Sequence, residues 1–272
     1  MVTGKSREMA KSRVEMVPGF EEASTNQILR LIINVQGQEK EGKTHFALTA
    51  PGPIALIDMD TGLEGVVSKF LKKNKKIYVA KFNYRDATNP DEWQSEWKKL
   101  KACVLDALIS KSIRSLVWDS CTEGWEMMRM AAFGKLAQVK PHHYAPVNAE
   151  FRDLLRKGYD SNKNLILIHK QKKSYVDEKW NGEYERAGFS DIGYAVQANI
   201  ISWRITVLDE KYGKKREDEY KGFGITIIDC RQIPELAGTE LLDLTEQGLP
   251  AMNNFPYLAS QVFPNTDPDD WS

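Results

Sequence analysis

The residues Gly37, Gly42, Lys43 and Thr44 follow the spacing G-x-x-x-x-G-K-[ST] within the segment LIINVQGQEKEGKTHFAL. Glycine permits backbone conformations that other residues avoid, so successive N–H groups of such a loop can point inward at a phosphate. The Lys43 ammonium would neutralise β- and γ-phosphate oxygens, and the Thr44 hydroxyl would ligate Mg²⁺. The spacing predicts a loop that binds ATP through Gly37, Gln38, Glu39, Lys40, Glu41, Gly42, Lys43, Thr44 and His45.

Two carboxylates, Glu39 and Glu41, lie inside this loop. Backbone N–H groups make the phosphate contacts in such a loop, so we expect both side chains to point to solvent or to a neighbouring subunit. The screened repulsion between exposed charges costs about 1 kcal/mol or less. The glutamates therefore lower the expected affinity for a polyphosphate without excluding its binding.

The segment SLVWDS places Asp119 at the end of an apolar run. A carboxylate at the tip of a buried strand beside the phosphate loop can hold Mg²⁺ through a water molecule. Asp119 comes 76 residues after Lys43, and two further strand-like runs lie between them. This spacing disfavours the small nucleotide kinases and favours the phosphate-loop ATPases that have an extra strand between the two motifs.

Polar residues also follow two other apolar runs. In IALIDMDTGLEG we expect Asp60, rather than Asp58, to orient the water that attacks the γ-phosphate; a turn or helix-capping role is the alternative. In NLILIHKQKK the first residue placed to contact the γ-phosphate is His169 and the second is Gln171, while a structural role is the alternative for the histidine. The predicted catalytic residues are Lys43, Asp60, Asp119 and His169.

These residues need elements to position them, and the apolar pattern predicts alternating strands and helices. Short β-rich runs predict strands within 28–35, 52–60, 75–83, 113–120 and 164–170. Apolar residues three and four apart predict helices starting near Asn89 and within 123–137 and 147–160. The alternation indicates an α/β fold with a mostly parallel central sheet flanked by helices. Two later runs, 199–210 and 223–231, predict antiparallel strands near the C-terminus.

Composition and residue pattern divide the chain into three parts. Residues 27–240 are expected to form one domain, preceded by a flexible polar arm over 1–26. Residues 241–272 form a C-terminal extension with little regular pattern, and its acidic end NTDPDDWS is expected to be solvated and disordered. As a hypothesis, this acidic end docks on a basic pocket of a replication partner or covers a nucleic-acid groove of its own chain.

The composition sets limits on partners and compartment. The 272 residues include 38 basic and 38 acidic side chains, so the formal net charge is zero and any nucleic-acid contact needs a local basic patch. No apolar run is long enough to span a bilayer, the N-terminal segment lacks the apolar core of a signal peptide, and the three cysteines lie far apart. These features predict a cytoplasmic protein with free thiols and no membrane partner.

Five pieces occur in the order GQEKEGKT, ALIDMDTGLEG, SLVWDSCTEGWE, LILIHKQKK and RAGFSDIGYAVQANIISWRI. This set, over residues 28–232, resembles the RecA-like phosphate-loop ATPase core, and more closely the small phage-encoded RecA-like proteins of single-strand annealing and recombination. The resemblance implies a DNA-stimulated ATPase that uses ATP and Mg²⁺ and assembles with copies of itself into a ring or filament. It further implies a bacterial host cytoplasm, and a single-strand-binding protein or an annealing protein as partner.

The same resemblance assigns roles to single residues. Asp60 takes the place of the water-activating residue, which is a glutamate in RecA, and Asp119 takes the Mg²⁺-linked place. His169 takes the place of the sensor. A basic residue from the neighbouring subunit would complete the site, and Arg204 and Arg231 are both candidates.

The resemblance also implies that the loops around 134–147 and 171–190 bind single-stranded DNA. The second segment mixes basic and aromatic residues around a Trp-Asn-Gly turn, and such side chains follow phosphates and stack on bases. Its candidate contacts are Lys170, Lys172, Lys173, Tyr175, Trp180 and Arg186. Because carboxylates in the same segment dilute the charge, an exposed hairpin or a subunit contact is an alternative role.

Two other functions stay open at this point. A helicase or packaging motor shares the phosphate loop, but it normally needs further domains. An ATP-binding accessory protein with little hydrolysis is compatible with Glu39, Glu41 and the aspartate at position 60. Strand unwinding would favour the first alternative, and normal DNA binding by a Lys43→Ala variant, beside a wild type without ATPase activity, would favour the second.

Overall fold

The computed structural model describes residues 29–60, 62–63, 65–83, 87–135, 139–209, 214–243, 245 and 248–272, with the side chains of 206–209 and 214–221 left aside. The expected N-terminal arm over 1–26 lies outside the described residues. Among the described helices, none has the length and apolar character needed to cross a membrane.

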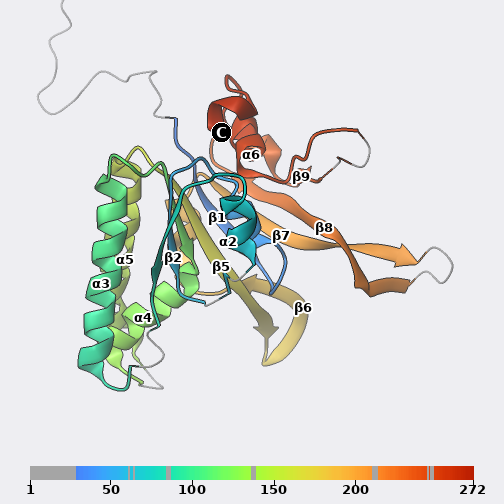
Figure 1. The fold of residues 1–272 in the computed structure, drawn as a ribbon. Coiled ribbons are helices and arrows are strands. Elements are labelled where there is room, and N and C mark those ends of the chain that lie inside the picture. Colours follow the sequence, from blue (N-terminus) through green and yellow to red (C-terminus); the bar gives the residue numbers. More distant parts are fainter. Residues whose placement is uncertain are drawn as a thin grey trace, which may run out of the picture.

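A nine-stranded sheet forms the centre of the described chain (Figure 1). Its order is β3-β2-β4-β5-β1-β7-β8-β9, with β6 paired to the outer part of β5. The pairs from β3 to β7 are parallel, whereas β5–β6, β7–β8 and β8–β9 are antiparallel. The strands are β1 Ile32–Gly37, β2 Ile54–Asp58, β3 Ile77–Lys81, β4 Ser115–Asp119, β5 Asn164–Val176, β6 Lys179–Arg186, β7 Ala198–Asp209, β8 Lys214–Cys230 and β9 Glu240–Leu241.

Helices cover both faces of this sheet, which confirms the expected α/β class with a mostly parallel central sheet and antiparallel strands late in the chain (Figure 1). The α-helices are α1 Lys43–Ala47, α2 Val66–Leu71, α3 Pro90–Ile109, α4 Cys121–Phe133, α5 Tyr144–Asp160 and α6 Phe255–Val262. Helix α3 begins where the sequence predicts: Asn89 accepts a hydrogen bond from the Glu92 backbone N–H at 3.0 Å, and Pro90 occupies the first turn.

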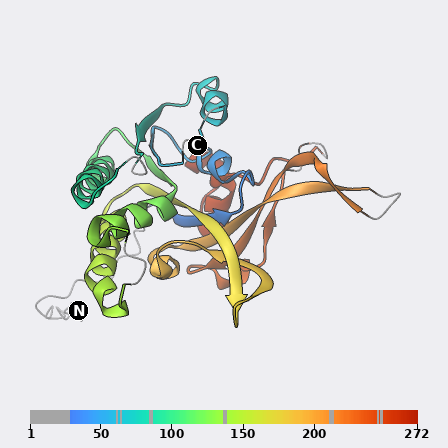
Figure 2. The ribbon, with the colours of Figure 1, turned by 90° about the horizontal axis from the view of Figure 1, so that it is seen from below.

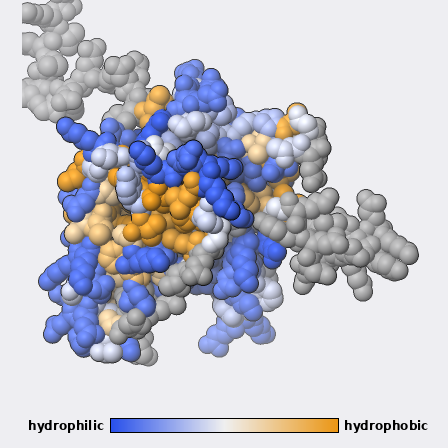
Figure 3. All heavy atoms as spheres, in the orientation of Figure 1, coloured by the Kyte–Doolittle hydropathy of each residue, from blue (hydrophilic) through white to orange (hydrophobic). Residues whose placement is uncertain are grey.

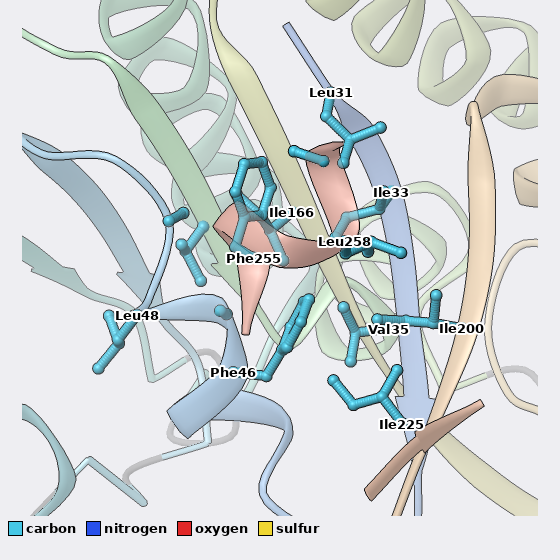
Figure 4. Close-up of a cluster of buried hydrophobic side chains, with 14 of the residues drawn as sticks. Leu31, Ile33, Val35, Phe46, Leu48, Ile166, Ile200, Ile225, Phe255 and Leu258 are labelled. Atoms are coloured by element: carbon cyan, nitrogen blue, oxygen red, sulfur yellow. The ribbon is translucent and has the colours of Figure 1, made fainter. Parts of the chain in front are cut away.

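Two hydrophobic layers lie against opposite faces of the sheet. One contains alternate β1 residues such as Ile33 and Val35 with Phe46, Phe255 and Leu258 (Figure 4). The other layer holds Ile32 of β1 and packs α3, α4 and α5 through residues such as Trp97, Trp118 and Phe151. Because successive side chains of a strand point to opposite faces, each central strand supplies both layers, and the carboxyl ends of the parallel strands are held at one edge.

The acidic C-terminal end is folded, so the expectation that it is disordered is wrong, although its three aspartates are exposed to solvent as expected. Residues Pro268–Trp271 form a 3-10 helix, and Trp271 is 2% exposed. Its ring packs on Phe255 and Phe263, and its indole N–H donates to Thr266 Oγ1 at 2.9 Å. The acidic composition predicted disorder, but the acidic residues cap a short turn. The neighbouring tryptophan then packs into the core of the same domain.

Two hairpins extend from the body of the molecule, one made by β5 and β6 and one by β7 and β8 (Figure 2). The β5–β6 turn falls at Asp177 and Glu178, both with positive φ, and not at the expected Trp-Asn-Gly sequence, which lies within β6. Figure 3 shows hydrophilic residues over much of the face of Figure 1, around a hydrophobic area near its middle.

Candidate nucleotide-binding site

The phosphate-binding sequence lies between β1 and α1, as the motif requires. Gly37 ends β1 and Gly42 precedes α1 with φ of 85°. A Cβ at Gly37 would lie 2.5 Å from the Ser202 carbonyl oxygen, and one at Gly42 would lie 2.4 Å from Cγ of Phe223. Because β7 and β8 press against the loop, both positions need glycine for space, and Gly42 needs it for its backbone conformation as well.

Lys43 folds back over the loop. Its Nζ donates to the Gly37 carbonyl at 2.8 Å and to the carbonyl of Gln38. Burial lowers the pKa of this ammonium, while the nearby carboxylates of Asp119, Glu41 and Asp60 act in the opposite direction. The ammonium group is therefore held where a phosphate bound in the loop would lie.

Thr44 and Asp119 meet although 75 residues separate them. The Thr44 hydroxyl donates to Asp119 Oδ2 at 2.6 Å. Asp119 ends β4 and lies opposite Asp58 in the parallel register of β2 and β4. Burial raises the pKa of Asp119 to about 6, against the hydrogen bond from Thr44 that stabilises the carboxylate.

This pair has the chemistry of a magnesium site. Hydroxyl and carboxylate oxygens are the donors that Mg²⁺ takes alongside phosphate oxygens and water. A dication would also stabilise the buried Asp119 carboxylate, whose pKa is raised in its absence. Thr44 and Asp119 would hold the ion, which when bound would neutralise negative charge on the phosphates.

A cavity of about 800 Å³ surrounds these groups. Every residue of the predicted phosphate loop lines it, from Gly37 to His45, together with Asp60 and Asp119. Three further residues line the cavity that we did not predict as part of it: Lys69 on α2, Phe223 on β8 and Lys170 on β5. Lys69 and Phe223 carry no local motif, so only the packing of distant segments reveals them.

Asp60 is held by a lysine at the rim of this cavity. Lys170 Nζ lies 2.7 Å from Asp60 Oδ1 and 2.5 Å from Glu123 Oε1. Burial acts to lower the pKa of Lys170, but the hydrogen bonds with Asp60 and Glu123 outweigh it and raise this pKa above its usual value. Lys170, which we predicted as a DNA contact, lines this cavity.

His169 requires a correction. Its side chain is 0% exposed and does not line the cavity, which the next two residues, Lys170 and Gln171, do. Nδ1 lies 3.3 Å from the Leu167 carbonyl oxygen, and burial lowers the pKa of the ring to about 3. The difference arises because His169 still lies in the part of β5 that is buried on both faces, and the strand becomes accessible only from Lys170 onward.

Glu41 also differs from expectation, whereas Glu39 is exposed. The Glu41 carboxylate turns into its own loop and accepts the backbone N–H of Gln38. Ser202 Oγ donates to the Glu41 carbonyl and thereby fixes the backbone of this residue against β7. Burial raises the pKa of the Glu41 carboxyl, so this negative charge is stabilised less well than in water.

The basic and aromatic segment forms the expected exposed hairpin. Tyr175 and Trp180 are 59% and 49% exposed, and Lys173 Nζ lies 4.9 Å from the centroid of the Trp180 ring. Lys172 pairs with Glu185 at 3.1 Å. Arg186 does not fit the predicted DNA contact, because it donates to the carbonyl groups of Phe189 and Ser190 at 2.6 and 2.8 Å and thereby holds the chain after β6.

The domain combines a phosphate loop, a mostly parallel sheet and a buried carboxylate at the end of β4. Together these features define a phosphate-loop nucleotide-binding domain. The profile of a family described as "AAA domain" matches residues 30–219, and the chain belongs to this family. A crystal structure of the RadB recombinase is similar with a TM-score of 0.47 and 13% identity, over 78% of this chain and 85% of that one. Among curated proteins none matches significantly.

Proposed function

We propose that this protein is an ATPase that binds ATP with Mg²⁺ and acts on single-stranded DNA in recombination or annealing of the phage type. The observation that carries the ATPase assignment is the contact between Thr44 and Asp119, at 2.6 Å, inside the cavity that the phosphate loop lines. Membership of the AAA domain family supports the same assignment.

Each group in the cavity has a role in this proposal. The N–H groups of the loop and Lys43 bind the β- and γ-phosphates, and Thr44 and Asp119 hold Mg²⁺. Asp60 lies beyond the end of β2 on the cavity wall and orients the attacking water. Gln171, which also lines the cavity, takes the γ-phosphate contact that we first gave to His169.

The DNA part of the proposal depends on the β5–β6 hairpin. Its exposed aromatic rings can stack on bases, and Lys172, Lys173 and Lys179 provide charge for the backbone. The hairpin continues β5, the strand that carries Lys170 and Gln171 at the cavity. ATP binding and DNA binding are therefore joined by one strand, and this favours DNA-stimulated hydrolysis.

Self-association into a ring or filament completes the proposal. A neighbouring subunit would supply a basic residue to the γ-phosphate, and Arg204, which is exposed on β7, and Arg231, after β8, are the candidates. A single-strand-binding protein or an annealing protein would be the partner, in the cytoplasm of a bacterial host.

The direct test measures ATP hydrolysis with and without single-stranded DNA. We expect stimulation by single-stranded DNA in the wild type, and loss of turnover in Lys43→Ala and Asp60→Ala. Lys157→Ala, an exposed lysine on α5, serves as the matched control and should hydrolyse ATP normally.

Three outcomes would contradict the proposal in different ways. A wild type that binds neither ATP nor ADP refutes the nucleotide site itself. Binding without hydrolysis, with DNA binding retained by Lys43→Ala, favours an accessory protein. Unwinding of duplex DNA by the isolated chain favours a helicase.

A further inference from the structure

Lys170 reaches across the active-site edge of the sheet to two carboxylates. It lies opposite Gly37 in the register of β1 and β5. From there its Nζ reaches Asp60, beyond β2, at 2.7 Å and Glu123, in the first turn of α4, at 2.5 Å. Because β4 lies between β2 and β5, the lysine side chain crosses the end of the strand that carries Asp119.

The backbone of Lys170 is held firmly. Its N–H donates to Thr122 Oγ1 at 3.0 Å, and its carbonyl accepts from the Ala187 N–H at 2.8 Å. Thr122 Oγ1 in turn donates to the Ala187 carbonyl at 3.2 Å. The Cα of Lys170 is thus fixed between α4 and the chain after β6, while the four-carbon stem above it can change rotamer.

The two carboxylates hold the ammonium group unequally. The Glu123 side chain is 9% exposed and lies near the N-terminus of α4, whereas the Asp60 side chain is 36% exposed. An ion pair that water can reach is weaker than a buried one and is more readily exchanged. When a nucleotide brings its phosphates into the cavity, the bond between Lys170 and Asp60 is the one that can be given up.

We propose that Lys170 is a mobile catalytic cation of the nucleotide site. Without nucleotide its ammonium group bridges Asp60 and Glu123. When ATP binds, it keeps Glu123 and moves from Asp60 to the γ-phosphate oxygens, and the released Asp60 carboxylate then orients the attacking water. This inference rests on the proposed ATPase function and adds a residue, within the same chain, that recognises the γ-phosphate.

The chemical step then proceeds without any further reactant. The water oxygen bonds to the γ-phosphorus, the bond from that phosphorus to the β,γ-bridging oxygen breaks, and ADP leaves with the electron pair. Asp60 accepts the hydrogen bond of the water, and the proton ends on the inorganic phosphate. Lys170 offsets the negative charge on the γ-phosphate oxygens, and ADP, which lacks these oxygens, leaves Lys170 bound to Asp60.

The test compares Lys170→Met, which removes the charge, with Lys170→Arg, which keeps it. Lys157→Met is the control, since Lys157 is an exposed lysine on α5 and does not line the cavity. We expect Lys170→Met to lower kcat about 100-fold and the affinity for ATP about tenfold, with the affinity for ADP unchanged. Lys170→Arg should retain part of the activity, and Lys157→Met should match the wild type in kcat and in both affinities.

Asp60→Asn provides a second measurement that does not depend on the lysine variant folding. It releases Lys170, so we expect tighter binding of ATP together with a loss of turnover. An unchanged kcat and an unchanged ratio of ATP to ADP affinity in Lys170→Met would overturn the inference, and so would equal losses of both affinities. In either case a wild type that hydrolyses ATP leaves the proposed function standing, whereas a wild type that binds neither nucleotide refutes both.

Discussion

The carboxylate of Glu41 accepts the backbone N–H of Gln38, inside the phosphate loop to which both residues belong. An N–H group of this loop that would face a phosphate is thus satisfied by the protein's own anion. The side chain must leave before a nucleotide can use the same donor. Glu41 therefore competes with the phosphate directly, which a solvent-exposed glutamate would not do.

Removal of this competitor should strengthen nucleotide binding. We expect Glu41→Gln to raise the affinity for Mg²⁺–ATP by about three- to tenfold, because a neutral amide gives up the N–H at lower cost. Glu39→Gln, at an exposed position of the same loop, is the control and should change affinity by less. Calorimetric titration of both variants measures the difference, and equal affinities would show that the Glu41 contact does not oppose binding.

Gly42 should be intolerant of a side chain for two reasons that can be separated. Its φ of 85° is unfavourable for alanine, and an added Cβ would meet Phe223 at 2.4 Å. Gly65 has a similar φ of 80°, with nothing within 4 Å of an added Cβ. We expect Gly65→Ala to cost about 1 kcal/mol of unfolding free energy, and Gly42→Ala to cost more and to abolish ATP binding. Chemical denaturation measures both, and equal costs would exclude the Phe223 contact as a cause.

The ionised Asp119 carboxylate should lower the stability of the folded protein, although it is the group that would bind magnesium. Burial raises its pKa from 3.8 to about 6, so the folded protein binds this proton more tightly than the unfolded chain does. The free energy of unfolding therefore falls as pH rises from about 4 to about 6, and the ionised carboxylate destabilises the fold above that range. We expect Asp119→Asn to stabilise the protein by on the order of 1–3 kcal/mol at pH 8 and by little at pH 4.

The same variant should lose Mg²⁺-dependent ATP binding, which separates the two effects. Thermal unfolding at both pH values, with exposed Asp153→Asn as the control, measures the stability difference. A variant that is less stable than the wild type at pH 8 would contradict the inferred cost of the buried charge.

Trp271 should act on stability and not on DNA binding. Its buried ring lies between Phe255 and Phe263, so Trp271→Ala should cost about 3–5 kcal/mol of unfolding free energy. Asp269→Asn, at an exposed position of the same turn, should cost little. Urea denaturation distinguishes the two. A stable Trp271→Ala variant with altered DNA affinity would favour the hypothesis that this end covers a nucleic-acid groove of its own chain.

The β5–β6 hairpin should bind single-stranded DNA through its aromatic rings. We expect Trp180→Ala and Tyr175→Ala each to weaken binding by about tenfold, since stacking of one base contributes about 1–3 kcal/mol. Tyr78→Ala is the matched control, because Tyr78 is 57% exposed, close to the 59% of Tyr175, but lies on the edge strand β3. Fluorescence anisotropy with an oligonucleotide measures the DNA affinity of all three variants. Equal affinities would show that the aromatic rings of the hairpin do not bind DNA.

Local pattern was sufficient for much of the fold. Helix α3 begins at its predicted cap, and strands β2 and β4 appear where the apolar runs place them, because caps and apolar runs depend on neighbouring residues. Prediction was wrong at His169 and at the C-terminal end. At His169 the outcome depends on where β5 emerges from the buried core, and at the C-terminal end it depends on the packing of Trp271 into that core.

The sequence by itself determined the chemistry of this protein: a glycine-rich loop, a lysine and a threonine after one strand, and carboxylates after two others. These signals are local, since each depends on residue type and on position at the end of a strand. Tertiary structure alone decided that Thr44 meets Asp119, that Phe223 closes on Gly42, and that Lys170 reaches Asp60 and Glu123. The strand order of the sheet brings these segments together, and no local pattern in the chain records that order.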